Sequence, residues 1–163
     1  MVKARRGLVL IPNMPDRGVA ADYGWLRGQV SDGELAKIQA AATDRPQALA
    51  TWSIQARNLK RMADAGVTVV VGTDGNTAWA PHVEMADMVA AGMTPAQVLT
   101  AATRTSAEFM RLADAGTIAA GKSADFIVLN ANPLDDITNT RRIAAVYLRG
   151  AAVDRAPFRV DTR

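Results

Sequence analysis

One carboxylate stands where α/β proteins place reactive groups. Asp74 follows closely on residues 67–71 (Val-Thr-Val-Val-Val), a β-branched run that predicts a buried strand. The carboxyl ends of such strands hold ligands and catalytic groups in α/β sheets and barrels. A carboxylate there can bind a divalent cation and can take a proton from a metal-bound water, whose pKa the metal lowers. The alternative is an Asx turn between Asp74 and the amide of Asn76, which the neighbouring glycines suit.

The chain has a single histidine, His82, beside Pro81 at the start of an expected helix. A lone histidine there is typically a surface or capping residue, and a histidine-based metal site needs partners that this sequence does not contain. Glu84 lies two positions further on, and side chains so spaced do not face each other on a helix. The local pattern therefore assigns His82 no metal.

The amino-acid composition excludes several kinds of chemistry. The chain contains no cysteine, which excludes disulfides, thiolate metal sites and thiol catalysis. With 49% apolar and 21% charged residues, the 163-residue chain is typical of a soluble globular protein. The net charge is +3, and the basic groups at residues 3–6 and 141–142 are short, so nucleic acid is not an expected partner. The apolar run at residues 8–11 is too short for a signal peptide or a membrane span.

Two glycine-containing stretches partly match the sequence patterns of phosphate-binding loops. Residues 72–75 (Gly-Thr-Asp-Gly) lack both the G-x-G-x-x-G spacing and the Walker ending. Residues 121–123 (Gly-Lys-Ser) match the tail of the Walker pattern but have no glycine at the required upstream position. Neither stretch predicts a nucleotide site.

The elements that would position Asp74 form a βαβ unit. Residues 7–12 and 67–71 predict two strands buried on both faces. Between them, Pro46 suits the first turn of a long helix, and Gly66 suits the left-handed residue that ends it. A strand, a helix and a second strand predict a parallel pair joined by a right-handed crossover.

Other helices are predicted from capping signals. Residues 31–34 (Ser-Asp-Gly-Glu) have the form of a capping box before a helix that reaches about residue 42. Residues 83–91 predict a helix that stops at Gly92. Thr94 and Pro95 precede a helix over residues 96–103, and residues 106–112 continue helically after a break.

After residue 112 the predicted secondary structure changes from helices to strands. Residues 124–129 and 143–148 predict strands, and Gly150 predicts a hairpin that returns the chain along residues 151–153. We therefore divide the chain into a partial barrel at residues 1–112 and a β-sandwich segment at residues 113–163.

Several of these stretches, taken in order, resemble the amidohydrolase superfamily. Residues 66–74 (Gly-Val-Thr-Val-Val-Val-Gly-Thr-Asp) and 91–99 (Ala-Gly-Met-Thr-Pro-Ala-Gln-Val-Leu) resemble its last barrel strand and helix. Residues 116–118 (Gly-Thr-Ile), 121–129 (Gly-Lys-Ser-Ala-Asp-Phe-Ile-Val-Leu) and 132–134 (Asn-Pro-Leu) resemble the tail that leads into a small β-sandwich. The resemblance covers about residues 7–153 and is strongest to the imidazolonepropionase-like and prolidase-like branch.

This resemblance implies an α/β fold, the C-terminal part of a (β/α)₈ TIM barrel, with strands seven and eight at residues 7–12 and 67–74. It implies that Asp74 is catalytic, as a metal ligand that also accepts the proton of the attacking water. It further implies that His82 lines the substrate pocket and that the cofactor is a divalent metal, Zn²⁺. The family's His-x-His pair, its lysine or glutamate bridge and its two later histidines would all precede residue 1.

Three functions are compatible with these features. The first is a hydrolase of carbon–nitrogen bonds in amides or cyclic amides, cytoplasmic, represented by a C-terminal fragment that is inactive alone. The second is a non-catalytic remnant or assembly module that completes a barrel with an N-terminal polypeptide or self-associates. The third is a small α/β module whose loop at residues 72–76 binds an anion.

Overall fold

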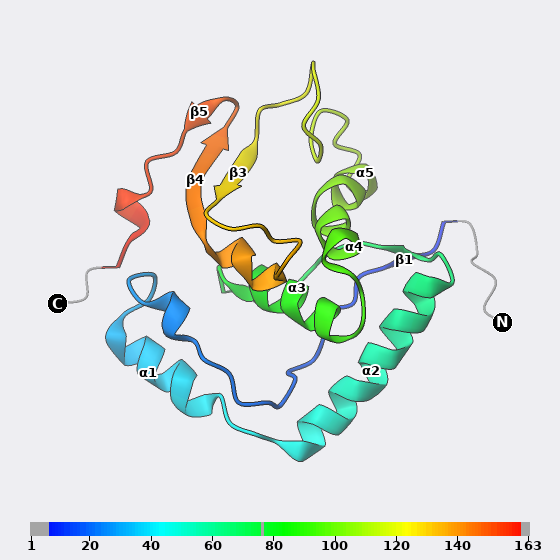
Figure 1. The fold of residues 1–163 in the computed structure, drawn as a ribbon, viewed down its shortest axis with the longest axis vertical. Helices are drawn as coiled ribbons and strands as arrows, with labels where there is room; N and C mark the ends of the chain where they lie inside the picture. The colour runs from blue at the N-terminus through cyan, green and yellow to red at the C-terminus, as the bar shows by residue number, and fades with distance from the viewer. Residues whose placement is uncertain (1–6, 76, 161–163) are drawn as a thin grey trace.

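The chain folds into helices packed around two small sheets. The computed structural model describes residues 7–75 and 77–160, and the basic group at residues 3–6 lies outside them (Figure 1). In chain order the elements are β1 (Val9–Leu10), the 3-10 helix η1 (Gly24–Leu26), α1 (Asp32–Ala41), α2 (Pro46–Asp64), β2 (Thr68–Val69), α3 (Ala80–Ala90), α4 (Pro95–Thr100), η2 (Ala101–Thr105), α5 (Ser106–Phe109), β3 (Phe126–Leu129), η3 (Ile137–Arg141), β4 (Ile143–Leu148), β5 (Ala151–Ala152) and η4 (Ala156–Phe158).

The predicted parallel pair is confirmed. β1 and β2 pair in parallel, with Val9 opposite Thr68 and Leu10 opposite Val69, and the helix between them is α2. Each strand is two residues long, shorter than predicted. The expectation that β1 is buried on both faces is wrong for its flanks, since Leu8 is 46% and Ile11 48% exposed. Among the described residues the sheet contains β1 and β2 alone, so these side chains have no further layer to cover them.

The helix boundaries follow the capping signals closely. Ser31 accepts a hydrogen bond from the amide of Glu34 and starts α1. Pro46 opens α2, and Gly66 takes the left-handed φ of 77° after it, as predicted. Thr94 and Gln97 form a reciprocal capping box at the start of α4. α3 begins three residues earlier than predicted, at Ala80.

The predicted break between residues 103 and 106 is wrong. The chain there forms a π-helical turn, η2, that joins α4 to α5 without interruption. The Ser106 hydroxyl donates to the carbonyl of Ala101 at 2.7 Å and accepts from the amide of Val71 at 3.4 Å. A side chain that forms a hydrogen bond within the turn and another to the segment after β2 favours the wider π geometry.

The C-terminal strands form an antiparallel sheet in the order β3-β4-β5. Tyr147 lies opposite Phe126 on one side and Ala152 on the other, and the two aromatic rings stack with centroids 4.6 Å apart. Arg149 and Gly150 both have positive φ, 51° and 81°, which is the geometry of a tight hairpin turn. The predicted hairpin at Gly150 is therefore confirmed.

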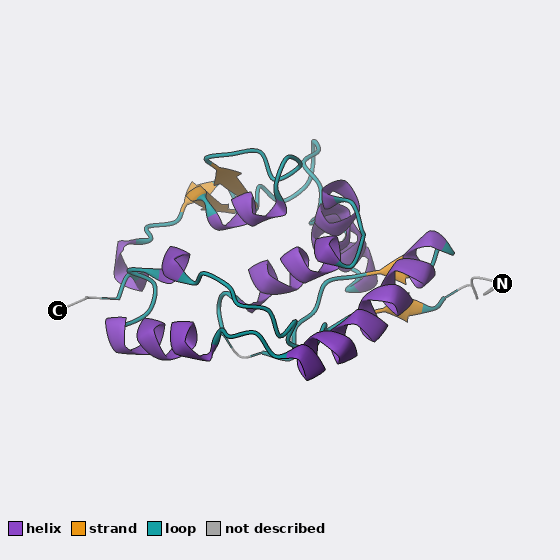
Figure 2. Cartoon of the chain, turned by 60° about the horizontal axis from the view of Figure 1, so that its bottom comes forward, coloured by secondary structure: helices purple, strands orange, loops and turns teal. Residues whose placement is uncertain are grey.

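A layered arrangement places the core between these parts. In Figure 2 the antiparallel sheet lies above α3 and α4, while α1 and α2 lie below. The core joins α2, β2, α3 and α4 to η3, and it contains Leu59, Val69, Met88, Val98 and Ile137. Within residues 7–75 and 77–160, no helix combines the length and apolar character needed to cross a membrane.

Candidate functional site

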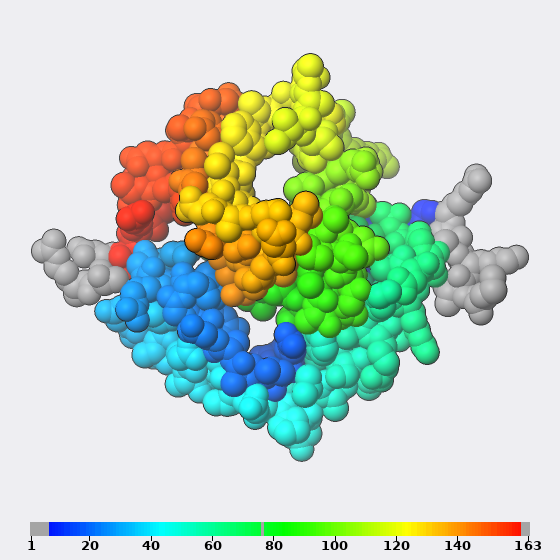
Figure 3. All heavy atoms as spheres, in the orientation of Figure 1, coloured from blue at the N-terminus to red at the C-terminus, as the bar shows by residue number. Residues whose placement is uncertain are grey.

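A cleft of about 420 Å³ opens beside α3. Its walls are the segment that follows β1, the loop that follows β2, the first turns of α3, and η3. Figure 3 shows the surface hollowed where the blue N-terminal segment meets the green and orange segments. Its volume lies in the range of small-molecule sites.

Asp74 lies on the loop after β2 and lines this cleft. Its backbone N–H donates to Oδ1 of Asn13 at 2.9 Å. Asn13 follows β1 and has a positive φ of 42°. The loops after the two parallel strands are thus tied together at the carboxyl ends of the strands, where the prediction placed Asp74. Asn76, the partner in the alternative Asx turn, lies outside the described residues.

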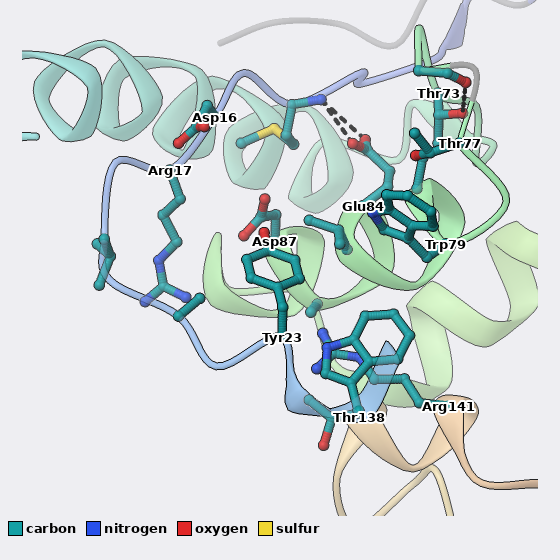
Figure 4. A pocket seen from close by; sticks show the side chains of 18 of the residues that line it. Asp16, Arg17, Tyr23, Thr73, Thr77, Trp79, Glu84, Asp87, Thr138 and Arg141 are labelled. Carbon is teal, nitrogen blue, oxygen red and sulfur yellow. Dashed lines mark hydrogen bonds between the residues drawn. The ribbon is translucent and has the colours of Figure 1, made fainter. Parts of the chain in front are cut away.

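Among the described residues, Glu84 is one of two buried carboxylates that line the cleft. Its side chain is on the first turns of α3, and the residue is 5% exposed. The amide of Met14 donates to both of its oxygens, at 3.1 and 2.9 Å (Figure 4). Burial raises the pKa of Glu84 to about 7, the Met14 amide opposes that rise, and the nearby charge of Asp87 adds to it.

Asp87 lies one turn further along α3 and is 8% exposed. Burial raises its pKa to about 6, while the positive charge of Arg17 opposes the rise and the negative charge of Asp16 adds to it. Neither Glu84 nor Asp87 is predicted as a site residue from the sequence. Their signal was a pair of carboxylates three positions apart in an otherwise apolar helix, which places both on one face.

Two arginines border the cleft and lie over aromatic rings. The guanidinium of Arg141 is 4.3 Å from the centre of the Trp25 ring, and that of Arg17 is 5.3 Å from the centre of Trp52. Both distances suit cation–π contacts. Nε of Arg141 is buried and has no hydrogen-bond partner within the described part of the chain.

His82 is not among the residues that line the cleft, but it packs against Trp25, which is. Its Nδ1 lies 3.0 Å from Oγ1 of Thr140, and its ring meets Trp25 edge-on at 6.0 Å. Thr140 uses its hydroxyl proton on the carbonyl of Ile137 at 2.8 Å, so His82 carries its proton on Nδ1 and donates. Burial, followed by the charge of Arg141, lowers the pKa of His82 and favours the neutral ring. The role of His82 in substrate binding stays a prediction.

The side chains of the described residues do not form a complete binding site for a divalent metal. A catalytic zinc site uses about three protein ligands. Across residues 7–75 and 77–160, no three His, Cys, Asp or Glu side chains come close enough to hold an ion. Asp74 can therefore supply one ligand, and its roles as ligand and proton acceptor remain predictions.

Comparisons with known proteins by sequence and by structure agree with one another. The model of the amidohydrolase family matches residues 18–153. Imidazolonepropionase of Deinococcus radiodurans is 30% identical over 141 residues, which cover 82% of this chain and 35% of that protein. The structure of molinate hydrolase is similar with a TM-score of 0.61 at 26% identity, over 91% of this chain and 33% of that one. A prolidase complexed with N-methylphosphonate-L-proline gives 0.54 at 28% identity, over 77% and 33%. The chain spans about a third of the length of these proteins.

Proposed function

This chain belongs to the amidohydrolase family, and we propose that it forms the part of a hydrolase barrel that carries Asp74 and one wall of the substrate cleft. In this proposal β1 and β2 are the seventh and eighth barrel strands. Six further parallel strands complete the barrel, in keeping with relatives that are about three times as long. The observation that carries the proposal is the position of Asp74, after a parallel strand and in the wall of the cleft.

The proposed reaction is hydrolysis of a carbon–nitrogen bond in an amide or cyclic amide. The imidazolonepropionase and prolidase relatives support this class of bond. Asp74 accepts the proton of the attacking water and later returns it to the leaving nitrogen, as a general base and then a general acid. The hydrogen bond from its own amide to Asn13 holds the loop that carries this carboxylate.

A divalent metal would supply a more acidic water and a polarised carbonyl in such a site. The residues described here do not make that site, so the proposal takes the other ligands from polypeptide beyond them.

The test is an assay of a completed barrel. This chain is produced together with any polypeptide that is encoded immediately upstream, and hydrolysis of dipeptides and cyclic amides is followed. Asp74→Asn should lower kcat by about 100-fold or more, because general base catalysis is lost. Asp135→Asn removes an exposed carboxylate outside the cleft and should leave kcat unchanged. Full activity in Asp74→Asn would exclude the proposed role.

One observation favours a second function, that of an assembly module. Leu8 and Ile11 flank β1 and are about half exposed. Exposed apolar residues beside an unpaired strand edge are typical of surfaces that recruit another chain. In this alternative the chain binds its N-terminal partner, or a second copy, without contributing to catalysis.

A further inference from the structure

We propose that Asp87 is a binding site for a primary ammonium group, so that the cleft takes a small amide that also carries a free amine. This inference rests on the proposed function in identifying the ligand as an amide. The recognition of the ammonium group rests on the geometry around Asp87 alone.

The first step is the contrast between the two carboxylates of α3. Glu84 accepts two hydrogen bonds from the amide of Met14. Asp87 is almost equally buried, at 8% exposure, yet it accepts no hydrogen bond from any residue in the described ranges. Buried carboxylates in folded proteins are normally paired, because desolvation without a partner is costly. Asp87 lines the cleft, so its oxygens are open to a ligand that enters it.

The second step concerns the arginines, which are the obvious internal partners. Within the described residues, the ion pairs join Arg45 to Asp16, Lys60 to Asp64 and Arg104 to Glu108, and none includes Asp87. Arg17 lies over Trp52 and Arg141 over Trp25 instead. The nearest cations are thus held on aromatic rings and leave the carboxylate without a direct counter-ion.

The third step is the shape of the surroundings. Figure 4 shows the carboxylate of Asp87 beside the ring of Tyr23, with Arg17 on one side and Glu84 on the other. A carboxylate next to an aromatic ring suits an alkylammonium group, which can donate to the oxygens and contact the ring face. A metal ion is a poorer candidate, since the described residues include no group of three metal-binding side chains. Asp74 lines the same cleft, so an amide bound by its amine at Asp87 shares a pocket with the proposed base.

The test uses two probes that differ in one charge. L-leucinamide carries a free ammonium group, and N-acetyl-L-leucinamide does not. Binding to the purified chain is followed by NMR titration in EDTA, so no turnover and no metal are involved. L-leucinamide should bind at least about tenfold more tightly than its acetylated form, because a hydrogen-bonded charge contributes that much. Asp87→Asn should abolish this preference, and the exposed control Asp135→Asn should keep it.

A second measurement avoids dependence on the folding of the variant. In the unmodified chain, saturation with L-leucinamide should lower the pKa of Asp87, read from its side-chain carboxyl carbon resonance, while the acetylated probe leaves it unchanged. The groups that face Asp87 and titrate or carry charge are Asp16, Arg17, Tyr23, Glu84 and Arg141. Equal binding of the two probes, or an Asp87→Asn chain with the original preference, would overturn the proposal. Because the titration needs no hydrolysis, its failure is distinguishable from inactivity of the Asp74 site.

Discussion

The amide of Met14 and the carboxylate of Glu84, 70 positions apart in the chain, are joined by hydrogen bonds of 3.1 and 2.9 Å. This contact fastens the segment after β1 to the first turns of α3, which follows β2. The packing of the segment after β1 against α3 therefore depends on one buried carboxylate.

The first prediction concerns the pH dependence of stability. Glu84 has an ordinary pKa of 4.5 and a folded pKa of about 7, so the folded chain binds more protons than the unfolded chain between these values. The free energy of unfolding should fall as the pH rises through that window. Glu84→Gln keeps an acceptor for Met14 and removes the charge. It should be more stable than the unmodified chain at pH 8, by about 1–2 kcal/mol after screening by water in the cleft, and about equally stable at pH 4.

Urea unfolding at both pH values measures this difference. Asp135→Asn, an exposed carboxylate, is the matched control and should follow the unmodified chain. A Glu84→Gln chain that is less stable at pH 8 than at pH 4 by the original amount would contradict the assignment.

The second prediction concerns metal content. The chain purified alone and dialysed should hold far less than one Zn²⁺ per molecule, because one carboxylate cannot make a tetrahedral site. Asp74→Asn should then leave the metal content unchanged. Elemental analysis by mass spectrometry decides this, and tight near-stoichiometric zinc in the unmodified chain would show that the site is complete without further ligands.

The third prediction concerns self-association. The chain alone should increase in mean mass with concentration, because Leu8 and Ile11 leave an apolar surface beside an open strand edge. Leu8→Lys should reduce the association. Ile118→Lys, which also replaces an exposed apolar residue, at 92% exposure, should not. Size-exclusion chromatography with light scattering gives the masses, and a concentration-independent monomer with cooperative unfolding would favour the independent binding module.

The fourth prediction concerns the close contact between the segments that follow the two parallel strands. A Cβ added at Gly72 would lie 2.6 Å from Cγ2 of Ile11. Gly72→Ala should therefore reduce the free energy of unfolding by about 1–3 kcal/mol, as overpacking does. Ile11→Ala removes the opposing methyl group, so the double variant should lose less than the sum of the two single losses. Urea unfolding measures each variant. Gly33→Ala in α1, where the added Cβ meets nothing within 4 Å, is the control and should stabilise the helix.

Local signals predicted most of the framework. Pro46, Gly66, Thr94 and Gly150 act through backbone geometry or bonds to residues a few positions away, so the sequence alone indicates where α2, α4 and the hairpin begin or end. The parallel pairing of β1 and β2 followed from their separation by a helix.

The contents of the cleft were not predictable in the same way. The Met14–Glu84 bond and the unpaired state of Asp87 depend on how the segment after β1 crosses α3, a contact between distant parts of the chain. The position of Asp74 could be predicted because the functional residues of α/β proteins lie in the loops that follow the carboxyl ends of the strands. The contacts of His82 could not, since they involve Thr140 and Trp25, each more than 50 positions away.

The π-helical turn of η2 holds one more residue than a regular α-helix would hold over the same rise. Deleting one position between Ala101 and Thr105 would therefore let the helix run on as a regular α-helix, with the segments before and after it near their present places. The bond from the Ser106 hydroxyl to the carbonyl of Ala101, five positions earlier, would then span four positions, as in a regular turn. A residue lost or gained outside the turn would instead rotate one part of the helix by roughly 100° against the other and move Ala107, which is buried and packed against Gly116.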